Sequence, residues 1–201
     1  GGVGFIGSHT VVELINQGYE VTIADDLSNS RPEVVDAIAE ITGVKPTFYQ
    51  VDLCDSAKTY ELFLKCKPSA VIHFAAKKLV GESVENPLEY YYNNLVSLMN
   101  VIRCSLDIGC HHLVFSSSCT VYGQPDELPV TEEAPRKDAE SPYGNTKKIA
   151  EDILADTVRI APLKVASLRY FNPVGAHSSA LIGEYPQGAP SNLMPVLTQA
   201  A

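Results

Sequence analysis

A tyrosine and a lysine near the middle of the chain have the spacing of a proton-transfer pair. Tyr143 and Lys147 are four residues apart in the segment SPYGNTK, so a helix there would place both on one face. A free tyrosine has a pKa of about 10 and is roughly 0.1% ionised at neutral pH, and lowering that pKa to 7 requires about 4 kcal/mol. A lysine ammonium in a partly buried site supplies attraction of this order. The pair could therefore form a general base.

The same spacing also fits an ordinary surface pair, so its context matters. Ser116, Ser117 and Ser118 end an apolar run that predicts a strand at 112–116. A hydroxyl at a strand end could hydrogen-bond a substrate oxygen and pass its proton to the tyrosine. Beside a nicotinamide cofactor, these groups would suit removal of a hydride from a carbon that carries a hydroxyl.

Glycines at the start of the chain suggest where such a cofactor would bind. Gly2, Gly4 and Gly7 have the G-x-G-x-x-G spacing and open a predicted helix. Glycine permits the tight turn and the close approach of backbone to a pyrophosphate, and the helix N-terminus offers N–H groups to it. A plain strand–helix turn could use glycines in the same way.

Acidic residues after the next two predicted strands favour the nucleotide interpretation. Asp25 lies 18 residues after Gly7, where a carboxylate can accept both ribose hydroxyls and repel a 2′-phosphate, which favours NAD over NADP. Asp26 strengthens that preference, and Arg31 weakens it slightly. Asp52 suits the adenine edge, and it could equally be a helix N-cap.

The elements that must position these residues alternate along the chain. Apolar periodicity predicts helices at 8–17, 33–42, 57–66, 87–107 and 142–159, and strands at 20–24, 46–51, 70–74, 112–116 and 164–169. Such alternation predicts an α/β fold, a Rossmann-like doubly wound parallel sheet with helices on both faces. One further, central strand is expected before Gly1. Ligands of such a sheet bind beyond the carboxyl ends of its strands, where the polar clusters fall.

Composition limits the classes of function. The 201 residues are 45% hydrophobic and 19% charged, with a net charge of −9. No segment has the apolar length of a membrane span, and the acidic balance disfavours nucleic acid or an anionic membrane as partner. Five cysteines without CxxC spacing fit a reducing, cytoplasmic location. Cys110-His111-His112 could suggest a metal ligand set, but a helix-to-strand connection is favoured, and no metal is expected.

Several segments together resemble one known family. They are, in order, GFIGSHTVVEL, VIHFAA, VGESVENPLEYYYNN, VFSSSCTVYG, SPYGNTK, LRYFNPVGAH and NLMP. The chain resembles the UDP-hexose 4-epimerases, a branch of the extended short-chain dehydrogenase/reductase family. The resemblance implies interconversion of UDP-glucose and UDP-galactose by transient oxidation at C4 with permanently bound NAD. The 4-keto sugar would turn over while its UDP stays anchored.

The resemblance also assigns roles to residues. The catalytic set would be Ser118, Tyr143 and Lys147. The cofactor would be bound by Gly1, Gly4, Phe5, Ile6, Gly7, Asp25, Asp26, Leu27, Ser28, Asn29, Ser30, Asp52, Leu53, Phe74, Ala75, Ala76, Lys77, Lys78, Asn93 and Phe171. The UDP-sugar would contact Ser118, Tyr143, Asn172, Asn192 and Leu193.

The chain departs from the family's usual pattern at four positions. Lys77 replaces a usual leucine, Asp26 an asparagine, Tyr185 an aspartate and Ser191 an asparagine. None removes a catalytic group, so these departures bear on sugar-nucleotide affinity rather than on the chemistry.

Two rival interpretations account for parts of the sequence less well. A nucleotide-sugar 4,6-dehydratase needs an acid–base Asp-Glu pair after the serine loop, where this chain has Cys119, Thr120 and Val121. A non-catalytic NAD-binding protein would not need an intact Ser/Tyr/Lys set. The tyrosines at 90–92 are interpreted as helix packing, and His177 as structural.

The resemblance implies a division of the chain. Residues 1–170 would form the NAD-binding domain without its first strand, and 171–201 the beginning of a substrate-binding region. We expect the chain to be truncated at both ends, to fold poorly alone and to lack turnover. The helices at 87–107 and 142–159 could pair two subunits in a homodimer.

Overall fold

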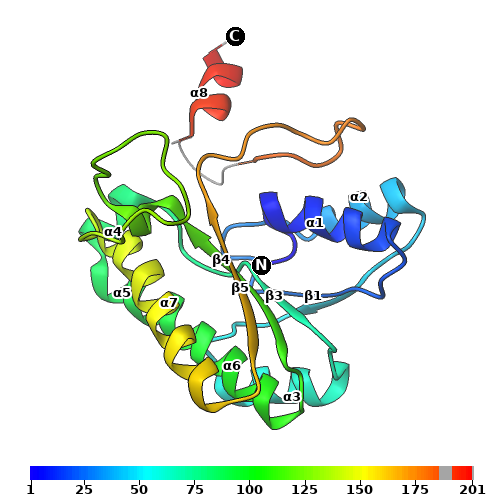
Figure 1. Cartoon of the computed structure of the whole chain (residues 1–201). Coiled ribbons are helices and arrows are strands. Elements are labelled where there is room, and N and C mark those ends of the chain that lie inside the picture. Colours follow the sequence, from blue (N-terminus) through cyan, green and yellow to red (C-terminus); the bar gives the residue numbers. More distant parts are fainter. Residues whose placement is uncertain (186–191, 201) are drawn as a thin grey trace. The chain divides into compact units, whose positions relative to one another are not determined.

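The computed structural model describes residues 1–185 and 192–200. It has an α/β fold with parallel strands, as the sequence predicts (Figure 1). The chain divides into two compact units, Gly1–Asp52 with Asn172–Ala201, and Leu53–Phe171. No helix in the described ranges combines the length and apolar character needed to cross a membrane.

The first unit is a small α/β layer. Its elements are α1 (Phe5–Asn16), β1 (Thr22–Asp25), α2 (Glu33–Thr42), β2 (Thr47–Gln50) and α8 (Leu193–Ala200). Strands β1 and β2 pair in parallel, with Thr22 opposite Thr47 and Asp25 opposite Gln50. Apolar side chains of α1, α2 and β1 form one buried core, which includes Val12, Ile23 and Ile38.

The second unit contains a three-stranded parallel sheet in the order β3-β4-β5. Its elements are α3 (Ser56–Cys66), β3 (Val71–His73), α4 (Val80–Glu85), α5 (Pro87–Tyr91), a π-helical turn η1 (Tyr92–Val96), α6 (Ser97–Asp107), β4 (His112–Ser118), a 3-10 turn η2 (Cys119–Tyr122), α7 (Pro142–Ile160) and β5 (Lys164–Tyr170). Leu98 of α6, Leu113 of β4 and Leu154 of α7 meet in its buried core.

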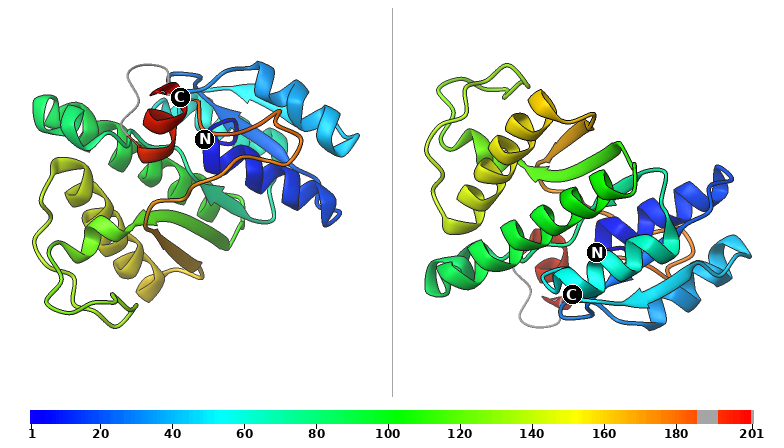
Figure 2. Two further views of the ribbon diagram at one scale, coloured as in Figure 1. Left: turned by 90° about the horizontal axis from the view of Figure 1, so that it is seen from above. Right: turned by 90° about the horizontal axis from the view of Figure 1, so that it is seen from below.

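Some elements differ from the sequence prediction. The single helix predicted at 87–107 is α5, η1 and α6, which follow one another as a continuous rod (Figure 2). The sequence predicts one sheet, whereas the described strands form two hydrogen-bonded sheets, β1-β2 and β3-β4-β5. The strand expected before Gly1 is not part of this chain, so that expectation stays untested. Helices α4 and α8 were not predicted.

Candidate active site

Helix α7 presents the predicted catalytic pair at its first turns. It begins at Pro142, whose fixed φ suits a first helical position. The side chain of the preceding Ser141 accepts a hydrogen bond from the Gly144 N–H at 3.1 Å and so caps the helix. This start fixes Tyr143 and Lys147 one turn apart on the same helix.

Lys147 is a buried cation, not half of a surface pair. Its residue is 5% exposed, and its Nζ donates a 2.8 Å hydrogen bond to the carbonyl of Ser116 near the end of β4. Nζ also lies 5.1 Å from the ring centre of Phe115 and 5.8 Å from that of Tyr143. Burial lowers the pKa of the Lys147 ammonium to about 8. The surface-pair alternative is therefore wrong for this residue.

Ser118 ends β4 and is buried beside the tyrosine. Its Oγ accepts a hydrogen bond from the N–H of Thr120 at 3.3 Å, which leaves its hydroxyl proton available for donation. The Ser118 side chain also lies close enough to Tyr143 to lower the pKa of its phenol. The structure therefore brings Ser118, Tyr143 and Lys147 together, as the sequence predicts.

The pKa of Tyr143 differs from the sequence prediction. The sequence predicts that Lys147 lowers this pKa toward neutrality, but burial raises the pKa of Tyr143 above its ordinary value, and the Ser118 side chain only partly opposes this. The Lys147 ammonium is directed at the Ser116 carbonyl. In the protein alone, the tyrosine is thus held as a neutral phenol.

A buried histidine lies close to this centre. His73 ends β3, is 4% exposed and stacks on Phe115 with ring centres 6.3 Å apart. Burial, reinforced by the positive charge of Lys147, lowers the pKa of His73 to about 3. The imidazole is therefore neutral at physiological pH.

The segment after β3, which carries predicted cofactor residues, is bonded to α7 through one side chain. Asn94 of η1 accepts a hydrogen bond from the N–H of Lys77 at 2.8 Å and donates to the Lys77 carbonyl at 3.0 Å. Its Nδ2 also donates to Thr146 Oγ1 at 3.0 Å. Asn93 donates to Asn94 at 3.0 Å. The predicted residues Phe74, Ala75, Ala76, Lys77, Lys78 and Asn93 thus belong to the same unit as Tyr143 and Lys147.

In the first unit, the glycine turn is tightly packed, by backbone at Gly7 and by a side chain at Gly2. A Cβ on Gly7 would lie 2.2 Å from the Gly1 carbonyl oxygen, and one on Gly2 would lie 2.8 Å from Ile23. By contrast, a Cβ on Gly4 would meet the Gly1 oxygen only at an ordinary 3.5 Å. No side chain of the described residues caps α1, so the N–H groups of its first turn are available to an anion.

Asp25 holds the loop that follows β1. Its Oδ1 accepts hydrogen bonds from the Leu27 N–H at 3.0 Å and the Ser30 hydroxyl at 2.8 Å, and its Oδ2 accepts one from the Val3 N–H at 3.3 Å. Leu27 has a left-handed backbone with φ of 65°, which is costly for a branched residue and recurs at ligand sites. The carboxylate thus joins the glycine turn to the predicted adenosine loop.

The other acidic positions have different roles. Asp26 is exposed and accepts hydrogen bonds from the N–H and hydroxyl of Ser28. The helix N-cap alternative for Asp52 is wrong, because Asp55 caps α3 by accepting a hydrogen bond from the Lys58 N–H at 3.1 Å. Leu53, which follows Asp52, accepts a hydrogen bond from Asn100.

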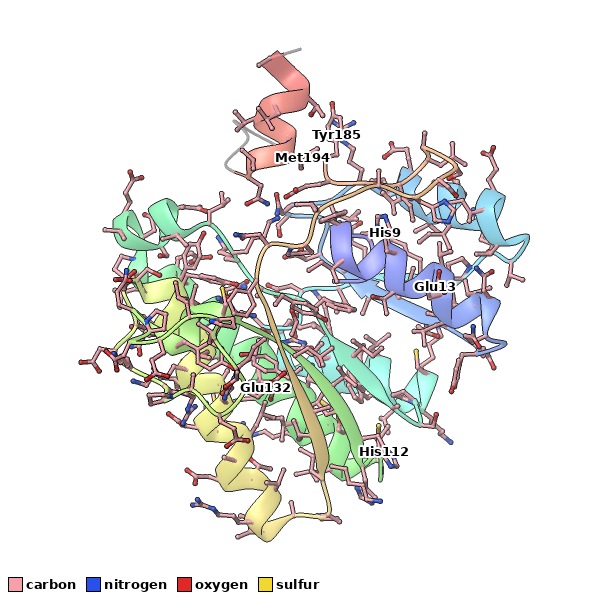
Figure 3. All side chains as sticks on the ribbon, turned by 45° about the horizontal axis from the view of Figure 1, so that its top comes forward. His9, Glu13, His112, Glu132, Tyr185 and Met194 are labelled. Carbon is pink, nitrogen blue, oxygen red and sulfur yellow. The ribbon has the colours of Figure 1, made fainter. Side chains whose placement is uncertain are left out.

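The first turn of α1 also lines a hollow within the first unit. Its volume is about 420 Å³, and Phe5, Ile6, His9 and Glu13 face 173–176 across it. Figure 3 labels His9 and Glu13 on this helix. Two predicted cofactor residues, Phe5 and Ile6, therefore border an open space.

The predicted sugar-binding residues Asn172 and Leu193 are exposed to solvent. Asn172 is exposed, Leu193 is 69% exposed, and Asn192 donates a hydrogen bond to Glu184. Phe171 is exposed and stacks on Tyr122 with ring centres 6.5 Å apart.

The four departures from the family pattern take different contacts. Lys77 forms an ion pair with Glu89 at 3.1 Å, and the Arg31 guanidinium lies 3.9 Å from the ring centre of Tyr185. Asp26 is the exposed loop residue described above. Ser191 lies outside the described residues.

The histidines of the Cys110-His111-His112 segment are remote from the catalytic set along the strand. His112 begins β4, whereas Ser118 ends it (Figure 3). Across the described ranges, no group of three metal-ligating side chains gathers at one point.

The sequence did not predict a second buried charged group on α7. Glu151 follows Lys147 by four residues and is 8% exposed. It is hydrogen-bonded to Ser117 of β4 and Arg169 of β5. The spacing from Lys147 was a visible signal, but the pairing with Arg169 depends on strand register.

The chain matches a known protein family along its whole length. The model of the NAD dependent epimerase/dehydratase family matches residues 1–201. The UDP-glucose 4-epimerases of Haemophilus influenzae and Bacillus subtilis are 47% and 50% identical to the chain over 202 residues, which cover all of it. The chain spans 60% and 59% of their respective lengths.

Solved structures agree with these relatives. A UDP-glucose-4-epimerase from Stenotrophomonas maltophila, with bound NAD and formylated UDP-arabinopyranose, has a TM-score of 0.94 and 49% identity. One from Bifidobacterium longum, in complex with NAD+ and UDP, has a TM-score of 0.95 and 44% identity. Each match covers 98% of this chain and 59% of the other.

Proposed function

Because the chain belongs to the NAD dependent epimerase/dehydratase family, we propose that it provides the NAD-binding part and the catalytic residues of a UDP-glucose 4-epimerase. Its substrates would be UDP-glucose and UDP-galactose, and two relatives of 47% and 50% identity are named UDP-glucose 4-epimerases. The observation that carries the proposal is the buried Lys147, one turn from Tyr143, with the buried Ser118 beside that tyrosine.

The first unit has the features that a dinucleotide needs. Gly2 and Gly7 leave no room for a Cβ, and the first turn of α1 offers uncapped N–H groups to a pyrophosphate. The adenosine would lie against 25–30 and Asp52. Phe74 to Lys78, Asn93 and Phe171 would line the nicotinamide half. When bound, NAD accepts a hydride from C4 of the sugar and returns it.

The residues of this chain would handle the proton. Ser118 would orient the sugar 4-hydroxyl. The proton of that 4-hydroxyl would pass to Tyr143 Oη, directly or through Ser118 Oγ. Tyr143 must first lose its own proton, which burial opposes in the protein alone. Lys147, held at the Ser116 carbonyl, would stabilise the phenolate by its charge. Reversal of the same proton path would complete epimerisation without net oxidation.

Several finer points belong to the same proposal. Residues 1–170 would bind the cofactor, and 171–201 would begin the substrate-binding part. Exposed apolar side chains on α5 and α7, among them Leu88 and Val158, would allow two subunits to associate through these helices. The scattered cysteines favour a reducing cytoplasm.

The decisive experiment uses the full-length protein and needs no added cofactor. Purified protein is given UDP-galactose, and formation of UDP-glucose is followed beside a Tyr143→Phe variant. We expect turnover by the wild-type protein and a loss of about 10²–10⁴-fold in kcat for the variant, because the general base is removed.

The NAD content of both proteins serves as the control. Equal NAD in the variant would assign its loss of activity to the chemical step. Wild-type protein that contains NAD but does not convert UDP-galactose would contradict this substrate assignment. Other nucleotide sugars would then be tested, with Lys77, Tyr185 and Ser191 as the first positions to revert.

A further inference from the structure

A buried carboxylate joins α7 to both strands that carry the catalytic end of the second unit. Glu151 Oε1 accepts hydrogen bonds from Ser117 Oγ at 2.6 Å and Arg169 Nε at 2.9 Å. Its Oε2 accepts from Arg169 Nη2 at 2.8 Å. The Arg169 contact is thus bidentate, a geometry that restricts the orientation of both groups.

The two strand residues lie next to each other. Ser117 of β4 and Arg169 of β5 are direct partners in the parallel ladder, and Glu151 contacts both. On the helix side, Glu151 follows Lys147 by one turn. Along β4, Ser117 lies between Ser116 and Ser118. The Ser116 carbonyl accepts the hydrogen bond from Lys147. One carboxylate therefore fixes how the catalytic face of α7 meets the catalytic end of β4.

Arg169 also contacts a second part of the site. Arg169 Nη1 donates a 2.9 Å hydrogen bond to the hydroxyl of Tyr122, and the guanidinium lies 4.8 Å from the ring centre of that tyrosine. Tyr122 stacks on Phe171. The outer cation Arg136 contacts Glu151 at 3.3 Å and Asp152 at 2.5 Å.

We propose that Glu151 and Arg169 are positioning residues, which set the distance between Ser118 and the Tyr143–Lys147 face of α7. The inference deepens the proposed function and rests on it for the identity of the reaction. A shift of about 1 Å at a reacting group can cost about 10²-fold in rate. Loss of the network would therefore reduce kcat while leaving substrate binding nearly intact.

The contact between Glu151 and Arg169 acts through its geometry, because both groups keep their charges. Burial opposes ionisation of Glu151, but the hydrogen bonds from Arg169 and Ser117 outweigh it and lower the pKa of the carboxyl. The hydrogen bonds to Glu151 likewise raise the pKa of Arg169. Both groups stay charged at neutral pH, so removing the pair together leaves the net charge of the site unchanged.

The test replaces both partners in the full-length protein. In Glu151→Leu/Arg169→Met, apolar side chains of similar size replace the ion pair, which is often neutral for stability. We expect the melting temperature to stay near that of wild type, with kcat about 10- to 100-fold lower and KM changed by less than about threefold. The variant Glu151→Gln/Arg169→Gln serves if the apolar pair does not fold.

Asp156→Asn is the matched control, because it removes an exposed ion pair with Arg159 from the same helix and should leave kcat unchanged. Wild-type kcat in the double variants would overturn the inference and leave the network a purely stabilising role.

A second measurement does not depend on the substrate. The Tyr143 phenol is titrated by NMR with ring-labelled tyrosine and is assigned through Tyr143→Phe. Lys147 on α7, Cys119 after β4 and Tyr90 on α5 are the titratable groups facing it, and both double variants retain them.

The Ser118 side chain lowers the pKa of Tyr143, so moving Ser118 away from Tyr143 in the double variants should raise that pKa. An unchanged pKa would contradict the inference. Absence of wild-type turnover would contradict only the proposed function.

Discussion

The glycine turn of the first unit and the catalytic end of the second unit are built in opposite ways. The glycine turn depends on missing side chains, since a Cβ at Gly7 would collide with the Gly1 carbonyl. The catalytic end depends on buried charged side chains, Lys147 and Glu151, that are 5% and 8% exposed. The first site is made by backbone geometry, and the second by electrostatic groups held away from water.

This difference predicts that substitutions in the two sites change stability and function in different ways. Where backbone forms the site, adding atoms should disturb folding and binding together, because there is no space for them. Where buried charges form the site, the charges themselves oppose folding, so removing one should separate stability from activity. The following substitutions test this contrast, beginning with the largest expected loss of stability and its matched comparison.

Gly7→Ala should give the largest change in stability. Its Cβ would lie 2.2 Å from a backbone oxygen, which no side-chain movement relieves. We expect the free energy of unfolding to fall by about 2–3 kcal/mol or more, with loss of bound NAD. Chemical denaturation and cofactor absorbance would measure the two effects.

Gly4→Ala is the matched comparison in the same turn. Its Cβ would meet the Gly1 oxygen at an ordinary contact distance, so stability should change by less than about 1 kcal/mol. Weaker NAD binding without destabilisation would support the cradle assignment. Equal destabilisation at both positions would refute the contrast between them.

Lys147→Met should stabilise the protein while abolishing its activity. Burial lowers the pKa of this lysine from 10.5 to about 8, so at pH 7 the folded state keeps an ammonium that burial disfavours. The corresponding gain in the free energy of unfolding is about 1–3 kcal/mol, reduced by loss of the hydrogen bond to Ser116.

The stability gained by Lys147→Met should depend on pH. The advantage of methionine should be complete below pH 8 and should disappear as pH rises toward 10.5, where the unfolded lysine also becomes neutral. Denaturant titrations of both proteins at pH 7 and pH 10 would measure it. A less stable methionine variant at pH 7 would show that the Ser116 contact outweighs the burial penalty.

His73 should make the smallest contribution at neutral pH and a larger one under mild acid. Its pKa is lowered from 6.5 to about 3 in the fold, so its contribution is present above pH 6.5 and is lost progressively as pH falls toward 3. Between pH 7 and pH 5, the wild-type protein should lose about 2 kcal/mol more than His73→Phe does. Parallel losses in the two proteins would contradict a neutral, buried imidazole.

The parts of the molecule that depend on local sequence were predicted well. The helix at 142–159 appears as Pro142–Ile160, because Ser141, Pro142 and an amphipathic repeat specify it without help from distant residues. The place of Ser118 at the end of β4 followed from the rule that ligand-binding polar groups lie beyond the carboxyl ends of parallel strands.

The parts that depend on distant contacts were not predicted. The turn η1 interrupts a strong helical pattern, where Asn94 bonds to Lys77 and Thr146, both far from it in sequence. The raised pKa of Tyr143 follows from burial, which a four-residue spacing does not reveal. The role of Glu151 needed the register of β4 and β5.

The pairing of Ser117 with Arg169 has a consequence for how the chain finds its native state. If β5 slipped by one residue against β4, Leu168 or Tyr170 would stand opposite Ser117, and Arg169 would turn to the other face of the sheet. Glu151 would then lose its bidentate partner and keep only the outer cation Arg136, and breaking a buried ion pair is destabilising. The contact between Glu151 and Arg169 therefore favours the native register of β4 and β5.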